Sequence, residues 1–343
     1  MARNKITPKK LARKRARRSV RRGDDSKSGA RPGLQTQVTG AGLWDVTSVG
    51  GTATVAAIRG QTAVVLRDAG FGERAVNNLK TEDYPDGAVP GDRVEIEIND
   101  GAGRIVSIGP RRSKLVRLRA EHGRMALAKE HVIAANVDIA VIVGSTTSPP
   151  FRPRLIDRYL VMCQYGGVEP LICINKIDLQ QPDEAALAIY TELGVTWTAV
   201  SAETGEGMDR LQALLQSKTA VLAGHSGVGK SSIINALTGE RSLQVGAVGT
   251  DRRGQHTTGS STMVEWSPDS LLIDTPGIRS LSLWDIDAQT LGGYFPEFAD
   301  RLSGCRYRDC THDREPDCAI RAATDAGHIA RARFDSYLRM LRE

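Results

Sequence analysis

The sequence lacks the features that would point to a membrane or secreted protein. Its 343 residues contain no apolar run long enough to span a bilayer and no recognisable signal peptide. Only five cysteines occur, and three of them cluster near the end of the sequence. This pattern argues against a disulfide scaffold and favours a metal site in a reducing compartment. We therefore expect a cytoplasmic protein that has no membrane partner.

Acidic residues are almost absent from the first 33 positions, which hold thirteen Lys and Arg against only Asp24 and Asp25. The rest of the chain carries 33 basic and 38 acidic residues, so the alkaline pI belongs to this segment. Such a segment cannot bury enough apolar surface to fold alone. We expect residues 1–35 to form a disordered basic tail that binds phosphates, with a merely solubilising tail as the alternative.

Residues 36–112 show short segments in which apolar and polar positions alternate. Gly and Asp-Gly turns separate these segments, as at Asp86-Gly87 and Asp100-Gly101. The clearest candidate strands are residues 52–55, 62–66 and 93–98. Short strands at this spacing predict a small closed all-β barrel, and we interpret it as an OB-fold.

The pattern changes near residue 137, where buried strands begin to alternate with helical stretches. The candidate strands are residues 138–143, 170–174, 196–200, 220–223, 261–266 and 271–274. Helices are predicted between them, for example at residues 184–193 and 208–215. Strands separated by helices predict a doubly wound α/β sheet, and we assign this domain to residues 113–285.

A phosphate-binding loop follows one of these strands and opens a helix. It reads Gly224-His225-Ser226-Gly227-Val228-Gly229-Lys230-Ser231 and continues into Ser232. Its glycines let backbone N–H groups point at phosphate oxygens, and the helix N-terminus adds positive potential. Lys230 is predicted to bridge the β- and γ-phosphates during catalysis, while the Ser231 hydroxyl ligates Mg²⁺.

A guanine-binding motif, Asn175-Lys176-Ile177-Asp178, ends a strand that precedes the phosphate loop. Asp178 can accept hydrogen bonds from the ring N1–H and the exocyclic amine of guanine, whereas adenine offers neither donor. The stem of Lys176 would pack along the base, and Ser201-Ala202 would reach guanine O6. These motifs predict GTP rather than ATP. Their order is reversed, because ordinary GTPases place the phosphate loop first.

Asp274-Thr275-Pro276-Gly277 closes a later strand and is the predicted second element on the Mg²⁺ side. Asp274 would hold Mg²⁺ through water, and the N–H of Gly277 would sense the γ-phosphate. Ile278 follows, at the position where Ras-like enzymes carry a glutamine that orients water. Isoleucine can neither accept nor donate a proton, so slow hydrolysis is expected unless another group positions the water.

The best internal candidate for that group is His256, in a Gly-containing loop spanning residues 249–258. A solvent-exposed loop histidine without a catalytic role is the alternative. In the same loop, Thr258 or alternatively Thr257 would cap Mg²⁺ and the γ-phosphate. The loop lies between the phosphate-loop helix and the next strand, which is the position of a first switch.

Three thiols and one imidazole lie close together in Cys305-x4-Cys310-x-His312-x5-Cys318. Four such ligands predict one closed, tetrahedral, structural Zn²⁺ site. The residues between the ligands are too polar to form a core, so metal binding would supply the folding energy. We assign residues 286–343 to a small, α-rich zinc-binding domain. It ends in an amphipathic helix whose apolar residues are Phe334, Tyr337, Leu338 and Leu341.

With these motifs the chain closely resembles RsgA (also called YjeQ), the circularly permuted GTPase family that matures the small ribosomal subunit. The resemblance runs from about residue 36 to residue 320 and includes Asp157-Arg158-Tyr159-Leu160 and residues 134–138. It implies an OB-fold, a permuted GTPase domain and a zinc domain. It also implies that His256 takes part in hydrolysis of GTP to GDP, that the small subunit accelerates this reaction, and that the factor acts late in assembly.

The expected macromolecular partner is therefore the small ribosomal subunit with its rRNA, bound by a monomer. Aromatic residues are scarce in the barrel, and base stacking needs exposed rings. We expect the barrel to dock on folded rRNA by shape and by basic contacts such as Arg111, Arg112 and Lys114. The alternative function is an RNA- and ribosome-binding nucleotide sensor with negligible catalysis, which Ile278 favours.

Overall fold

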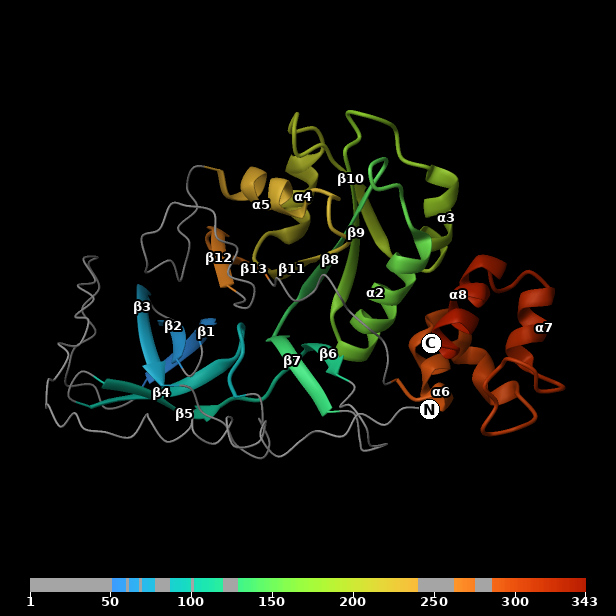
Figure 1. The fold of residues 1–343 in the computed structure, drawn as a ribbon, viewed down its shortest axis with the longest axis horizontal. Coiled ribbons are helices and arrows are strands. Elements are labelled where there is room, and N and C mark those ends of the chain that lie inside the picture. The colour runs from blue at the N-terminus through green and yellow to red at the C-terminus, as the bar shows by residue number, and fades with distance from the viewer. Residues whose placement is uncertain are drawn as a thin grey trace, which may run out of the picture. The chain divides into compact units, whose positions relative to one another are not determined.

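The computed structural model describes residues 51–59, 62–67, 70–77, 87–99, 102–119, 129–239, 262–274 and 286–343 (Figure 1). The predicted basic tail of residues 1–35 lies outside the described residues, and so does the predicted switch loop of residues 249–258. Every described helix is too short or too polar to cross a lipid bilayer.

Five strands in the N-terminal part are paired in a closed ring. They are β1 (Gly51–Arg59), β2 (Thr62–Arg67), β3 (Gly70–Asn77), β4 (Arg93–Asn99) and β5 (Ala102–Ile108). Strand β1 pairs with β2 and β4, β3 pairs with β2 and β5, and β4 pairs with β5. Such closure leaves no free sheet edge. Its core consists of small and branched side chains, namely Ala53, Val55, Ala63, Ala88, Val94, Ile96 and Ile105.

A buried ion pair fixes the segment that leads into β4. Asp92 is fully buried, and its carboxylate accepts hydrogen bonds from Nε and Nη2 of Arg111, both at 2.8 Å. It also accepts the backbone N–H of Val89 at 2.8 Å. Arg111, which we expected to contact RNA, is therefore part of the internal structure. Arg112 is different, because 70% of its side chain is exposed.

A hairpin that the sequence patterns did not predict, β6 (Lys114–Arg119) and β7 (Lys129–Ala135), follows the barrel. The next residue, Asn136, adopts a left-handed conformation with φ 52°. Its side chain donates to the carbonyl of Gly91 and accepts the N–H of Arg112, both at 2.9 Å. Asp138 then accepts the N–H of Thr219 at 2.8 Å. Residues 134–138 therefore connect the barrel to the sheet.

The central sheet contains all six predicted strands, with ends shifted by one or two residues. They are β8 (Ile139–Ser145), β9 (Glu169–Asn175), β10 (Thr196–Ala199), β11 (Thr219–Ala223), β12 (Thr262–Ser267) and β13 (Ser270–Asp274). Their spatial order is β10-β9-β8-β11-β13-β12, and only β12 in this set runs antiparallel to its neighbour. Strand β12 also pairs with β1 of the barrel, through Thr262 and Ala57.

Helices cover both faces of this sheet (Figure 1). Helices α2 (Pro153–Gly166) and α3 (Glu184–Glu192) pack on one face, and α4 (Met208–Leu215) and α5 (Lys230–Thr238) on the other. The alternation of β8 explains this division. Ile139, Val141 and Val143 belong to the core under α4 and α5, whereas Ala140 and Ile142 belong to the core under α2 and α3. All seven residues of β8 are buried, as expected for a strand inside a parallel sheet.

Short helices make up the C-terminal part, as predicted. They are α6 (Ala288–Leu291), the 3₁₀ helices η3 (Gly292–Tyr294) and η4 (Pro296–Gly304), α7 (Ala319–Asp325) and α8 (Arg331–Leu341). Phe298 lies at their centre, with its ring centroid 5.1 Å from those of Phe295 and Tyr337. Phe334 and Tyr337 are buried as expected, whereas Leu338 and Leu341 are only partly covered.

The Asp92–Arg111 pair yields a prediction for the stability of the barrel. Replacing Asp92 with Ala leaves the Arg111 guanidinium, whose side chain is only 13% exposed, without its carboxylate, which costs about 3 kcal/mol or more. Urea denaturation should show this loss in the transition of the barrel. Glu97→Ala is the matched control, because its partner Arg104 is 65% exposed and the loss should stay below about 1 kcal/mol. Equal losses for the two variants would contradict the assigned role.

Candidate functional site

The predicted nucleotide motifs meet at one edge of the central sheet. Strands β8, β9, β10, β11 and β13 run parallel, so their carboxyl ends lie on the same side. The guanine-binding motif follows β9, Ser201 follows β10, the phosphate loop follows β11, and Asp274 ends β13. Ligands of open α/β sheets bind at this edge.

The backbone of the phosphate loop requires glycine at two of its positions. Gly224 and Gly229 have φ angles of 143° and 95°. A Cβ atom on Gly224 would collide with the carbonyl oxygen of Val143, and one on Gly229 would collide with the side-chain amide of Asn175. The loop therefore packs directly against the ends of β8 and β9. Lys230 Nζ donates to the carbonyls of Gly224 and His225 at 2.7 and 2.8 Å, which holds its ammonium group over the loop.

Asn175 joins three motifs that lie far apart in the sequence. Its side chain is buried, and its Nδ2 donates to the carbonyl of Val228 in the phosphate loop at 2.9 Å. Its Oδ1 accepts the backbone N–H of Ala202 at 3.1 Å. Ser201, also buried, shapes the same turn, because its Oγ accepts the N–H of Thr204 at 3.1 Å. One amide group thus fixes the guanine-side segments relative to the phosphate-side loop.

A segment that the sequence analysis did not single out supports this arrangement. It follows β8, and Thr146 donates its N–H to the carbonyl of Asn175 at 3.1 Å and its hydroxyl to that of Lys176 at 2.8 Å. Lys176 has φ 67°, and its Nζ donates to the carbonyl of Ser148 at 2.5 Å. Pro149 lies beside Gly227 of the phosphate loop. The sequence could have indicated this segment, because it follows a buried strand at the carboxyl edge of the sheet.

The remaining predicted residues differ in what the structure describes. Asp178 is exposed and makes no hydrogen bond within the described part of the chain, and Ser226, Ser231 and Ser232 are exposed as well. Asp274 is placed by its backbone, at the end of β13. Three predicted residues lie outside the described residues: His256, Thr258 and Gly277.

Helix α2 connects the phosphate loop with the C-terminal helices. The pKa of Tyr159 on this helix is raised to about 12, because burial outweighs the opposing effect of the Gly224 backbone in the phosphate loop. Asp157, earlier on the same helix, accepts from Arg333 Nη1 of α8 at 2.6 Å and from the Tyr190 hydroxyl at 3.0 Å. Glu297 completes the group and accepts from Arg333 Nε at 2.7 Å.

The charges of this group are almost completely buried. The side chains of Arg333 and Asp157 are each 3% exposed. Burial by itself would lower the pKa of Arg333, but Asp157 and Glu297 outweigh that effect and the pKa is raised. The guanidinium also lies 4.8 Å from the ring centroid of Phe295. Removing Arg333 would leave two carboxylates buried without their cation, so this group attaches α8 firmly to α2.

The four predicted metal ligands come together in the C-terminal part. The ligand atoms of Cys305, Cys310, His312 and Cys318 all lie within 4.8 Å of one another. His312 Nδ1 is 3.5 Å from the Cys305 sulfur and 3.4 Å from the Cys318 sulfur, and these two sulfurs are 3.9 Å apart. Tetrahedral metal–thiolate geometry implies separations of about 3.5 to 3.8 Å. The cluster can therefore hold a metal ion.

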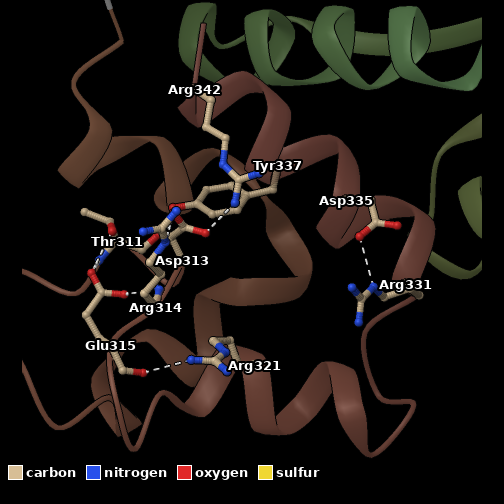
Figure 2. A network of polar contacts seen from close by, with 9 residues as sticks. All are labelled: Thr311, Asp313, Arg314, Glu315, Arg321, Arg331, Asp335, Tyr337 and Arg342. Atoms are coloured by element: carbon tan, nitrogen blue, oxygen red, sulfur yellow. Dashed lines mark hydrogen bonds and ion pairs between the residues drawn. The ribbon is translucent and has the colours of Figure 1, made fainter.

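Helix α8 supports the loop that carries His312 (Figure 2). The Tyr337 hydroxyl donates to the carbonyl of Thr311 at 2.7 Å, and Arg342 donates to Asp313 at 2.6 Å. Glu315 closes the loop by accepting the N–H and the hydroxyl of Thr311 at 2.9 and 2.6 Å. Burial opposes the charge of this carboxylate, but these hydrogen bonds hold its pKa at about 2.

Two solved structures have the same overall arrangement. The crystal structure of YjeQ from Thermotoga maritima matches with a TM-score of 0.67 and 27% identity, covering 86% of this chain and 98% of that one. The structure of YloQ, described as a circularly permuted GTPase, matches with a TM-score of 0.63 and 26% identity over 85% of this chain and 94% of its own. The fold is that of a circularly permuted GTPase.

Sequence comparisons define the family within this class. Residues 108–284 match the RsgA GTPase family. The small ribosomal subunit biogenesis GTPase RsgA of Shewanella oneidensis is 42% identical over 255 residues, which cover 72% of this chain and 70% of that protein. The protein of the same name from Chlorobaculum tepidum is 40% identical over 73% of this chain and 83% of its own. The chain belongs to the RsgA family of GTPases.

The contact between Gly229 and Asn175 can be tested with a pair of glycine variants. Gly229→Ala adds a Cβ that must displace the Asn175 amide, whereas Gly239→Ala, at the other end of α5, meets no atom within 4 Å. Gly239 has φ 56° and ψ −155°, a region that residues other than Gly rarely adopt, so the control carries backbone strain at least as great as that at Gly229, which has φ 95° and ψ 24°. Titration with a fluorescent GDP analogue should show affinity reduced at least tenfold only in the first variant. Equal affinities would refute the role of this contact.

Proposed function

We propose that this chain is a Mg²⁺-dependent GTP hydrolase that binds the small ribosomal subunit and assists its late maturation. The arrangement around Asn175 carries the nucleotide part of the proposal, because it joins a phosphate loop to a guanine-binding segment. The printed name of the RsgA relatives, small ribosomal subunit biogenesis GTPase, supports the ribosomal part.

The proposed roles at the nucleotide site follow the motifs. Residues 224–232 wrap the phosphates, Lys230 neutralises charge that develops on them, and Ser231, Thr258 and Asp274 hold Mg²⁺ directly or through water. The exposed carboxylate of Asp178 pairs with the two donors of guanine. Asn175, Lys176, Ser201 and Ala202 shape the base pocket, and Gly277 senses the γ-phosphate.

His256 is the proposed group that positions the attacking water, in place of the glutamine that Ile278 replaces. We propose that docking on the small subunit brings His256 into this role, so that hydrolysis is stimulated by the ribosome. Holding one water in line lowers the entropic cost of attack. The second candidate function is a ribosome-bound nucleotide sensor with negligible catalysis, and Ile278 is the observation that favours it.

Zinc is the proposed metal of the Cys305, Cys310, His312 and Cys318 cluster. Three thiolates and one imidazole in a closed arrangement suit structural Zn²⁺ and leave no position for a substrate. When bound, the ion would hold the loop together with the short helices around it. The aromatic residues near His312, Phe298 and Tyr337, are then the apolar surroundings of that centre.

We further propose the domain boundaries 1–35, 36–112, 113–285 and 286–343, with the barrel as an OB-fold. The ring of pairings β1-β2-β3-β5-β4 supports that interpretation. The barrel and the basic tail are the proposed rRNA-binding elements, and the protein acts as a cytoplasmic monomer. Arg112 is the better candidate for an RNA contact than Arg111, since its guanidinium is exposed.

Turnover measurements test the enzymatic proposal. GTP hydrolysis should rise strongly when purified small subunits are added, and His256→Ala should lose about a hundredfold of the stimulated rate. His328→Ala is the matched control, an exposed histidine on the C-terminal part. If the wild-type protein shows no stimulation, the nucleotide-sensor function is correct instead. Full stimulation in His256→Ala would remove this residue from the mechanism.

Metal analysis tests the zinc proposal. One equivalent of Zn²⁺ per chain is expected, and Cys318→Ser should lose it, with rapid proteolysis of the segment after residue 286. Cys163→Ala is the control, because Cys163 is a buried residue of α2 outside the cluster, so this variant should retain the metal. Iron in place of zinc, or full protection of a metal-free variant, would contradict the assignment.

A further inference from the structure

A large groove lies between the N-terminal end of α2 and helix α8. Its volume is about 970 Å³, which is the size of a site for a peptide segment or a small ligand. Apolar side chains line part of it, including Phe151, Pro153, Leu155 and Met340. Neither the proposed GTP site nor the metal cluster uses this groove.

The groove carries unbalanced positive charge, because its ion pairs account for all of its acidic side chains but not for all of its arginines. Its three acidic residues all have basic partners: Asp157 pairs with Arg333, Asp335 with Arg331 and Glu343 with Arg158. The Asp335–Arg331 pair is visible in Figure 2. Arg342 is neutralised by Asp313. The acidic side chains of the groove are thus already satisfied.

Three arginines of the groove have no such partner. Arg152, Arg154 and Arg339 are exposed, and their guanidinium groups make no ion pair or hydrogen bond within the described part of the chain. Arg152 and Arg154 lie at the start of α2, and Arg339 lies on α8, so the three line the groove from both of its walls. Guanidinium groups bind carboxylates in a planar, bidentate manner, which suits an anionic partner.

The groove already shows how it binds a carboxylate. Arg158, only 25% exposed, pairs with the side chain of Glu343 through both of its terminal nitrogens. Its Nε is buried and has no hydrogen-bond acceptor. The two terminal nitrogens of Arg158 thus already hold one carboxylate of the same chain, while its Nε is out of reach of solvent.

We propose that this groove is a docking site for an acidic peptide segment of a partner protein. The apolar side chains that line the groove would contact the apolar side chains of the peptide, and its arginines would pair with the carboxylates of the peptide. The apolar floor favours a peptide over an RNA strand, because a phosphodiester backbone has no apolar side chains to bury there. Amphipathic segments that lay an apolar face into a groove are a common recognition mode. In this proposal Glu343 competes with the incoming carboxylates for Arg158.

The experiment uses the full-length protein and a fluorescein-labelled peptide of Glu and Leu, with the leucines at helical spacing, followed by fluorescence anisotropy. We expect saturable binding that becomes about tenfold weaker in the Arg154→Glu/Arg339→Glu variant. Arg210→Glu/Arg308→Glu is the control with the same change of charge, because both residues are exposed and lie outside the groove. Glu343→Gln should bind the peptide several-fold more tightly.

Four results would overturn the proposal. One is absence of saturable binding to the wild-type protein, and a second is an equal loss in the control variant. A third is unchanged affinity when the leucines of the peptide are replaced by serine, since this would leave only general charge attraction. The fourth is displacement of the peptide by a uridine oligonucleotide whose own binding falls in the Arg154 and Arg339 variant, since this would identify an RNA site.

Discussion

The amide side chain of Asn175 makes the contacts on which the arrangement of the proposed nucleotide site depends. It satisfies a carbonyl of the phosphate loop and an N–H of the Ala202 turn at the same time, and it is buried. Buried polar groups are costly unless they are paired, so this geometry holds the three segments in one arrangement. These hydrogen bonds depend only on where the segments lie in space. The same contacts can therefore form whichever segment comes first along the chain.

The strand order of the sheet is likewise independent of the order of the strands along the chain. The strand that carries the phosphate loop, β11, lies between β8 and β13, although β8 precedes it by many residues. A cut and a rejoining of the chain at surface loops leave the hydrogen-bonded ladder unchanged. What changes is the neighbour along the chain, and β13 now leads toward the metal-binding part rather than into the rest of the sheet.

Much of the fold and of the site could be predicted from the sequence, because the deciding signals are local. The glycines of the phosphate loop, the alternation of β4 and the spacing of the four metal ligands each depend on residues close together in the chain. All six strands of the central sheet were found for the same reason. The permuted fold is confirmed by the solved structures.

The features that were missed depend on distant partners. Arg333 reads as an ordinary exposed residue of an amphipathic helix, yet it is buried because Asp157 and Glu297 neutralise it, and Asp157 is 176 positions away. Arg111 reads as a free basic residue for the same reason, although Asp92 fixes it inside the barrel. The hairpin of β6 and β7 has no clear alternation that would separate it from its surroundings.

The pairing of Thr262 with Ala57 gives the barrel a mechanical connection to the sheet. Within the described residues, this is the position at which a strand of the ring and a strand of the central sheet share a ladder. Thr262 begins the strand that emerges from the predicted switch loop. Any movement of β12 would therefore reach β1 through a main-chain pairing, with no side chain in between.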